Sequence, residues 1–383
     1  MKKQSFIWLG IPSLAVAALT ATGCGGSNSS LAAPIPPPAY NANVAGQQIP
    51  SLAPAMRALQ PLVASQPLKY GPTDTAIWID KKNPAKSIVF TTDDHAKDGA
   101  LVAFDLSGKI VTRVDGMDGC YGVDVQYGYM MGKDRVDLLV ATETKAKKLR
   151  IYKVVGGANP LIEITGKTAV FEKSPATEAE PTAMGLYKRF DGNFYAVVAR
   201  AKGPQQAILG EYKLVTDGKT VDTKFVRSFG TFSGEGDKQD NSIASITVDS
   251  PRGRVYYADA KVGFREYRAD PDLKESTHEL SMFGTQGFVG RHGALAIAKD
   301  YVLGVEQTSD GAALHVYPRD GKGTRADAGV IKTGSDFAAG VEAACRPMGD
   351  KFPNGIVAVT SAKDKTVQIY DWRDFAKSLG VKP

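Results

Sequence analysis

The chain has 383 residues, of which 43% are hydrophobic and 23% charged, and its formal net charge is +6. This composition is typical of a soluble globular protein, and beyond the N-terminus no apolar run reaches the 18 residues of a membrane-spanning helix. The mildly basic charge suits a polyanionic ligand. It is also common in proteins that bind none, so it selects no class of ligand.

The first 23 residues, Met1–Gly23, have the pattern of an export signal. Lys2 and Lys3 form a positive start, Phe6–Leu19 is a short apolar stretch, and small residues precede Cys24. The small residues resemble the cleavage box of bacterial lipoproteins, whose cysteine is diacylated and becomes the mature N-terminus; the alternative is an ordinary secretory signal that happens to contain a cysteine. We expect an exported protein attached to the cell envelope through lipid on Cys24 and not through a helix. The glycine after the cysteine indicates the outer membrane of a Gram-negative cell.

Residues 24–60 are interpreted as a flexible linker. They are rich in Ser, Ala, Asn and Pro and show no strand or helix period. The triple proline at 36–38 favours an extended spacer. The linker would give the folded part reach from the membrane.

From Thr73 onward, short strands recur in sets of three, separated by polar turns. The third strand of the first set carries an aromatic residue before a charged turn. This aromatic position returns about every 50 residues, close to the repeat length of a four-stranded propeller blade; its six occurrences are Phe104, Tyr152, Tyr212, Tyr267, Tyr317 and Tyr370. A strand precedes each aromatic, at Ser87–Thr91, Val136–Thr142, Phe194–Ala199, Arg254–Ala258, Tyr301–Glu306 and Gly355–Thr360, and an apolar strand precedes each of these. A β-sandwich with chance spacing is the alternative, but six matched sets favour an all-β fold, a six-bladed β-propeller, with residues 61–375 as one domain.

The ring needs a closing strand, because the sixth set ends at Trp372 without a fourth strand. Pro61–Tyr70 precedes the first set, and we predict that it pairs as the outer strand of the last blade. Residues 376–383 are predicted to be a short tail.

The three cysteines bear on the redox state. With Cys24 lipidated, Cys120 and Cys345 remain in an oxidising compartment. They lie at the start of the second blade and in the sixth, so a ring could bring them together. A disulfide and two unpaired thiols are both open.

Common catalytic motifs are absent from the sequence. The four histidines lack metal-binding spacing, and Gly166-Lys167-Thr168 has Leu161 where a P-loop needs its first glycine. No nucleic-acid-binding motif is present, so we expect no nucleic-acid partner.

Acidic residues stand near strand ends and are predicted to face one side of the ring. Clustered carboxylates at a propeller mouth suit calcium, which takes six to eight oxygen ligands; acids in exposed turns are the alternative for each one taken singly. The residues concerned are Asp74, Asp124, Glu180, Asp249, Asp259 and Asp336.

Several segments, in matching order over about Pro61–Phe375, resemble the β-propeller phytase family. They are Asp74–Trp78, Lys82–Pro84, Ser87–Thr92, Gly122–Val125, Glu180-Pro181, Leu186-Tyr187, Tyr267 and Phe352–Gly355. The resemblance implies a six-bladed propeller that removes phosphate from myo-inositol hexakisphosphate (phytate), with calcium ions at the mouth that bind the phosphates and hold the attacking water. It implies a phosphorylated small molecule as ligand, and we expect a monomer.

Residue by residue, the resemblance implies calcium ligands at Asp74, Asp124, Glu180, Asp259 and Asp336, and phosphate-binding lysines at Lys97 and Lys202. Other family positions have changed: one leading acid is Thr73, a phosphate-binding arginine is Gln126, a tyrosine is Thr182, and acids are replaced at Ala244, Lys261, His292 and Ala339. Fewer carboxylates should weaken each calcium site, because ligand charge sets affinity.

Three functions compete. The first is a calcium-dependent phytase-like phosphomonoesterase with weak activity. The second is a catalytically eroded propeller that binds a ligand or protein partner at the envelope. The third is another six-bladed enzyme, such as a metal lactonase, for which the sequence offers no specific residues.

Overall fold

The computed structural model describes residues 58–233, 243, 245–260, 262–321 and 325–383. The described strands form six four-stranded antiparallel sheets, which are the six blades of a β-propeller. Cys24, the export signal and most of the linker lie outside the described residues, so the lipid anchor remains a prediction. Within the described part, no helix is long and apolar enough to cross a membrane.

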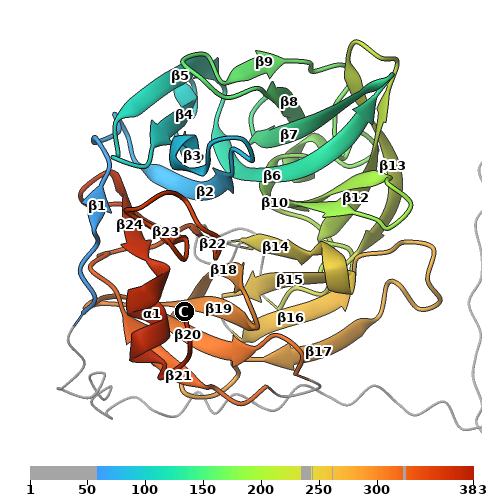
Figure 1. Cartoon of the computed structure of the whole chain (residues 1–383). Helices are drawn as coiled ribbons and strands as arrows, with labels where there is room; N and C mark the ends of the chain where they lie inside the picture. The colour runs from blue at the N-terminus through green and yellow to red at the C-terminus, as the bar shows by residue number, and fades with distance from the viewer. Residues whose placement is uncertain (1–57, 234–242, 244, 261, 322–324) are drawn as a thin grey trace, which may run out of the picture. The chain divides into compact units, whose positions relative to one another are not determined.

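The first strand of each blade lies nearest the centre of the ring (Figure 1). These inner strands are β2 (Pro72–Trp78), β6 (Cys120–Met131), β10 (Pro181–Lys188), β14 (Ile246–Asp249), β18 (Arg291–Ala298) and β22 (Val341–Ala344). The second strands are β3 (Ile88–Asp93), β7 (Asp134–Glu143), β11 (Phe194–Arg200), β15 (Arg254–Asp259), β19 (Tyr301–Thr308) and β23 (Ile356–Ser361). The predicted propeller and its predicted second strands are confirmed.

The third strands carry the repeating aromatic residues. They are β4 (Gly99–Asp105), β8 (Lys148–Val154), β12 (Leu209–Thr216), β16 (Gly263–Arg268), β20 (Gly311–Pro318) and β24 (Thr366–Asp371). The outer strands are β5 (Ile110–Met117), β9 (Leu161–Glu163), β13 (Val221–Phe229), β17 (Glu279–Phe283), β21 (Gly329–Lys332) and, for the sixth blade, β1 (Val63–Ala64).

The six aromatic side chains are buried between successive blades, each in its own hydrophobic cluster. In three blades the tyrosine hydroxyl also accepts a backbone N–H donated from the segment that follows the outer strand of the preceding blade. The acceptors are Tyr212 (from Phe171, 2.7 Å), Tyr267 (from Thr231, 3.0 Å) and Tyr370 (from Gly334, 2.9 Å). The repeat therefore marks the residue that fastens one blade to the one before it.

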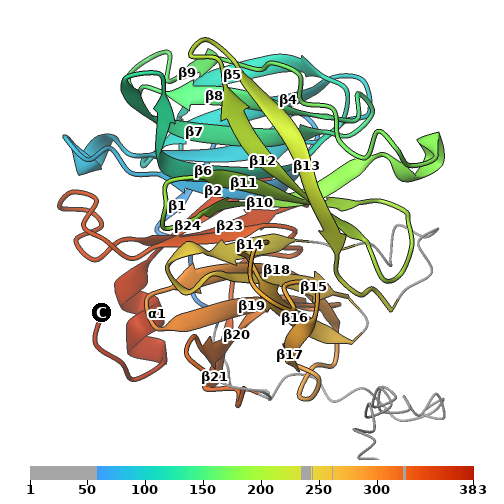
Figure 2. The same cartoon turned by 90° about the vertical axis from the view of Figure 1, so that its right-hand side faces the viewer.

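The ring closes as predicted. Strand β1 pairs with β24, with Val63 opposite Ile369 and Ala64 opposite Gln368. Helix α1 (Trp372–Ser378) follows β24 and lies beside β20 and β21 (Figures 1 and 2). Its Ala376 is buried, so the residues expected as a short tail begin inside the helix.

Candidate functional site

The ring has two ends, defined by the direction of the inner strands. At the front end the inner strands begin and the second strands finish, as the pairing of Pro72 with Asp93 and of Pro181 with Arg200 shows. At the back end the inner strands finish. A seven-residue strand such as β2 spans roughly 23 Å, so residues at the two ends cannot share one small ligand.

Most of the predicted site residues lie at the front end. Asp74 is in the first half of β2, Lys97 joins β3 to β4, and Lys202 follows β11; Glu180 precedes β10, Asp259 ends β15 and Asp336 precedes β22. The expectation for Asp249 was wrong. Asp249 ends β14 at the back end and binds Arg319 there through two contacts of 2.6 Å.

Glu180 and Asp259 are each bound by a basic side chain. Lys145 Nζ lies 2.9 and 3.0 Å from the two Glu180 oxygens. Asp259 is buried and accepts from Arg265 Nε at 3.0 Å and from the Ser233 hydroxyl at 2.7 Å. These partners neutralise the charge that a calcium ion would otherwise meet.

Asp336 holds a neighbouring turn. Its Oδ1 accepts from the Ser361 hydroxyl at 2.9 Å and from the Lys363 backbone N–H at 3.1 Å. This contact ties the start of β22 to the turn after β23, which is a structural role.

Asp74 and Asp124 lie deeper, in the central channel, and each joins two blades. Asp74 accepts backbone N–H groups from Thr75 (2.9 Å) and from Val123 of the second blade (3.0 Å). Asp124 accepts from Val125 (2.6 Å) and from Leu186 of the third blade (2.7 Å). Two lone-pair positions of each carboxylate are therefore already used.

A third channel acid, Glu342 of β22, was missed by the sequence analysis. It lines the same constriction as Asp74 and Asp124. Gly340-Val341-Glu342 repeats the order Gly122-Val123-Asp124, and this match could have identified it. A Cβ at Gly340 would lie 2.7 Å from Asp74 Cα, so glycine there permits the close approach of neighbouring inner strands.

Loss of hydration deep in the channel raises the pKa of all three acids. The pKa of Asp74 is raised to about 8 and that of Asp124 to about 7, and the pKa of Glu342 lies well above its ordinary value. Repulsion from Asp124 contributes to the shifts of Asp74 and Glu342. None of the three has a basic partner among the described residues. Three carboxyl groups without a counter-charge fit a calcium ion, which would relieve their repulsion.

The fit is loose. Within the described residues, no group of three or more His, Cys, Asp and Glu side chains is already arranged to hold a metal ion. An ion would have to displace protons and draw the three carboxyl groups inward, both of which weaken binding.

The two predicted phosphate-binding lysines are available. Lys97 and Lys202 are exposed at the front end, and no carboxylate in the described residues pairs with either. Gln126 lies instead at the back end of the channel. It lines a recess there, and its side-chain amide donates to Ser250 Oγ at 3.2 Å. It therefore cannot act with these lysines. The changed positions Ala244 and Lys261 lie outside the described residues.

His292, where the family resemblance implied an acid, belongs to an aromatic stack. The ring of Phe288 lies 4.0 Å from that of His292 and 4.1 Å from that of His315. His315 contacts Asp327 (2.5 Å) and Glu306 (2.9 Å), and Glu306 also accepts the N–H groups of Val289 and Gly290. The stack fixes the segment before β18 at the front end.

This arrangement predicts a pH effect on stability. Burial acts to lower the pKa of His315, but the contacts with Asp327 and Glu306 outweigh it and raise the pKa. The stabilisation by protonated His315 should be complete below about pH 6.5, its unfolded value, and lost as the pH rises through the folded pKa. Urea unfolding should show that His315→Gln is more destabilising at pH 6 than at pH 9. A difference in stability that does not change with pH would contradict this. Glu306 does not confound the comparison, because its lowered pKa keeps it ionised from pH 6 to pH 9.

Both described cysteines are free thiols and not a disulfide. Cys120 is buried, and its thiol lies 3.1 Å from the Ala100 carbonyl oxygen. Cys345 is half-buried and lines the recess at the back end.

Fold and site together define a closed six-bladed propeller with carboxyl groups in its channel and exposed lysines at its front end. The family model described as Phytase matches residues 63–372. The chain is also 24% identical over 332 residues to the 3-phytase of Bacillus subtilis (strain 168), with 81% of each chain covered. The chain therefore belongs to the β-propeller phytase family.

Proposed function

We propose that the protein is a calcium-dependent phosphomonoesterase of low activity that acts on phytate or related phosphate esters. The family match along the whole propeller supports the reaction class. The low activity is inferred from two ion pairs. Lys145 binds Glu180 and Arg265 binds Asp259, so neither carboxylate is free to bind calcium.

In this proposal the substrate lies at the front end. The ammonium groups of Lys97 and Lys202 bind phosphate oxygens, because both are exposed and neither is paired with a carboxylate of the described residues. Asp74, Asp124 and Glu342 would hold calcium, which supplies charge neutralisation and an activated water when bound. Lys145 can also bind a substrate phosphate, but it must first break its ion pair with Glu180.

A second function is favoured by the same salt bridges. If the front-end carboxylates stay bound to their basic partners, the propeller binds a phosphorylated ligand without hydrolysing it.

The test is phosphate release from phytate by the mature protein, with calcium chloride or with the chelator EGTA. We expect slow release that EGTA abolishes and that Asp74→Asn lowers roughly tenfold, because ligand charge sets calcium affinity. Asp115→Asn is the matched control, since Asp115 is exposed and outside the channel. Calcium should also raise the melting temperature, because it binds only the folded state. Calcium-induced stabilisation without release would favour the binding function, and release insensitive to EGTA would refute the calcium dependence.

A further inference from the structure

The back end of the channel opens into a recess of about 660 Å³ that the phosphomonoesterase proposal does not use. Residues from all six inner strands line it, together with residues of connecting segments. A second recess of about 490 Å³ shares Gln126, Val248, Ile297 and Arg319 with it. This size is typical of a pocket for a small molecule.

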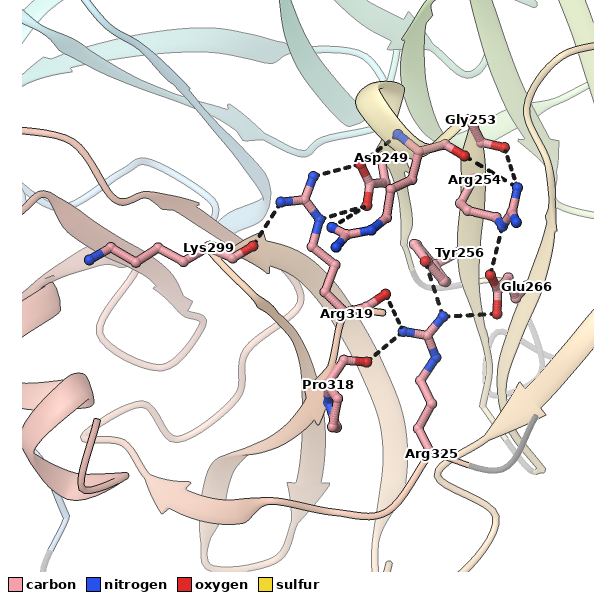
Figure 3. A network of polar contacts seen from close by, with 10 residues as sticks. Asp249, Gly253, Arg254, Tyr256, Glu266, Lys299, Pro318, Arg319 and Arg325 are labelled. Atoms are coloured by element: carbon pink, nitrogen blue, oxygen red, sulfur yellow. Dashed lines mark hydrogen bonds and ion pairs between the residues drawn. The ribbon is translucent and has the colours of Figure 1, made fainter. Parts of the chain in front are cut away.

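Four basic side chains line the recess: Lys81, Lys299, Arg319 and Arg346. Arg319 is neutralised, because its guanidinium binds both oxygens of Asp249 (Figure 3). For Lys299 and Arg346, no carboxylate partner exists among the described residues. Lys81 has one carboxylate partner in this part of the chain, the distant Asp137, at 3.9 Å.

Aromatic rings position the two lysines in place of carboxylates. The ammonium of Lys81 lies 4.8 Å from the centre of the Tyr127 ring, and that of Lys299 lies 5.8 Å from a ring of Trp372. A ring face attracts the cation but accepts no strong hydrogen bond from it. The N–H donors therefore remain available to an anion.

The backbone of Lys299 supports a role for its side chain. Lys299 lies in the turn between β18 and β19 with φ of +52°, in the left-handed region that disfavours residues other than glycine and asparagine. Its carbonyl oxygen accepts from Arg319 at 2.7 Å, while its side chain extends away from the Arg319–Asp249 pair (Figure 3). Arg319 thus holds the strained turn in a conformation that presents the lysine.

The carboxyl groups in the recess limit where an anion can bind. Asp124 and Glu342 lie at its inner end, towards the channel constriction. They would repel an anion that entered deeply, so negative groups must stay near Lys81, Lys299 and Arg346.

We propose that the back recess binds a small molecule carrying two or more phosphate groups. Three cations from the first, fifth and sixth blades surround one opening, and the Arg346 guanidinium matches the paired oxygens of a phosphate. This site is separate from the front end and does not depend on hydrolysis there.

The experiment is a calorimetric titration of the mature protein with inorganic tripolyphosphate in EDTA, which removes calcium from the front end. We expect saturable binding that weakens with added salt and falls at least tenfold in Lys299→Gln/Arg346→Gln. Lys109→Gln/Lys219→Gln is the matched control, because both lysines are exposed on turns outside the recess, and it should bind as the unmodified protein does.

Lys81→Gln provides a second test that leaves the strained turn untouched, and it should also weaken binding. Equal melting temperatures will show that each variant is folded. The proposal is overturned if tripolyphosphate does not bind, if Lys299→Gln/Arg346→Gln binds as well as the unmodified protein, or if binding is lost in the front-end variant Lys97→Gln/Lys202→Gln and kept in Lys299→Gln/Arg346→Gln.

Discussion

A chain that begins at Gly71 should unfold at a much lower temperature than one that begins at Ala58, and it should aggregate. The deletion removes β1 and so leaves β24 as an open edge, a known template for association. It also removes Val63 and Leu68 from the core between the sixth and first blades, each contributing about 1.5–3 kcal/mol.

The deletion also affects Asp93, whose side chain is fully buried. Asp93 accepts backbone N–H groups from Lys69 (3.2 Å), Tyr70 (2.9 Å) and Gly71 (2.8 Å). Without the N–H donors of Lys69 and Tyr70, the buried Asp93 carboxylate keeps Arg113 as its main partner. Thermal unfolding followed by circular dichroism would measure the effect. Equal melting temperatures for the two chains would mean that β1 does not close the ring.

The second large effect is expected for Arg319→Met. It should lower the free energy of unfolding by about 3–5 kcal/mol, because among the described residues the fully buried Asp249 side chain keeps only the longer ion pair, to Arg252 at 3.8 Å. Urea unfolding of the protein would measure the loss. The change also frees the Lys299 carbonyl and so loosens the turn between β18 and β19.

Lys69→Met is the control for Arg319→Met. The Lys69–Asp98 pair is as short, at 2.6 Å, but both side chains are largely exposed. Water and salt screen such a pair, so its loss should leave the urea midpoint unchanged. Similar losses in the two variants would contradict the importance of burial for the Asp249–Arg319 pair.

The fold was predictable from the sequence because every blade repeats the same physical requirement. Each third strand places one large aromatic residue against the preceding blade, and this produces a regular period that the sequence displays directly. The closing strand was predictable from the same repeat, because the sixth set of strands ends without the fourth strand that a blade needs.

The site was less predictable, because its electrostatics depend on partners distant in the chain. Glu180 pairs with Lys145, which lies in the preceding blade, and Asp249 pairs with Arg319 of the next. No local pattern identifies these pairs. Glu342 was the exception: its Gly-Val-acid order matched that of Asp124 and was overlooked.

The family resemblance transferred the architecture better than the roles of single residues. Gln126 was compared with a phosphate-binding arginine, yet it lines the back recess. Since one strand carries residues from the front end to the back end, a match within a strand does not establish which end a side chain serves.

The most direct test of the central claim is the initial rate of phosphate release from phytate at saturating calcium, measured beside the 3-phytase of Bacillus subtilis. We expect release that requires calcium and is roughly a hundredfold slower or more. The reason is that Glu180 and Asp259 are bound to basic partners and so are not free to hold calcium, which would neutralise charge in the transition state. A calcium-dependent rate equal to that of the Bacillus enzyme would contradict the account.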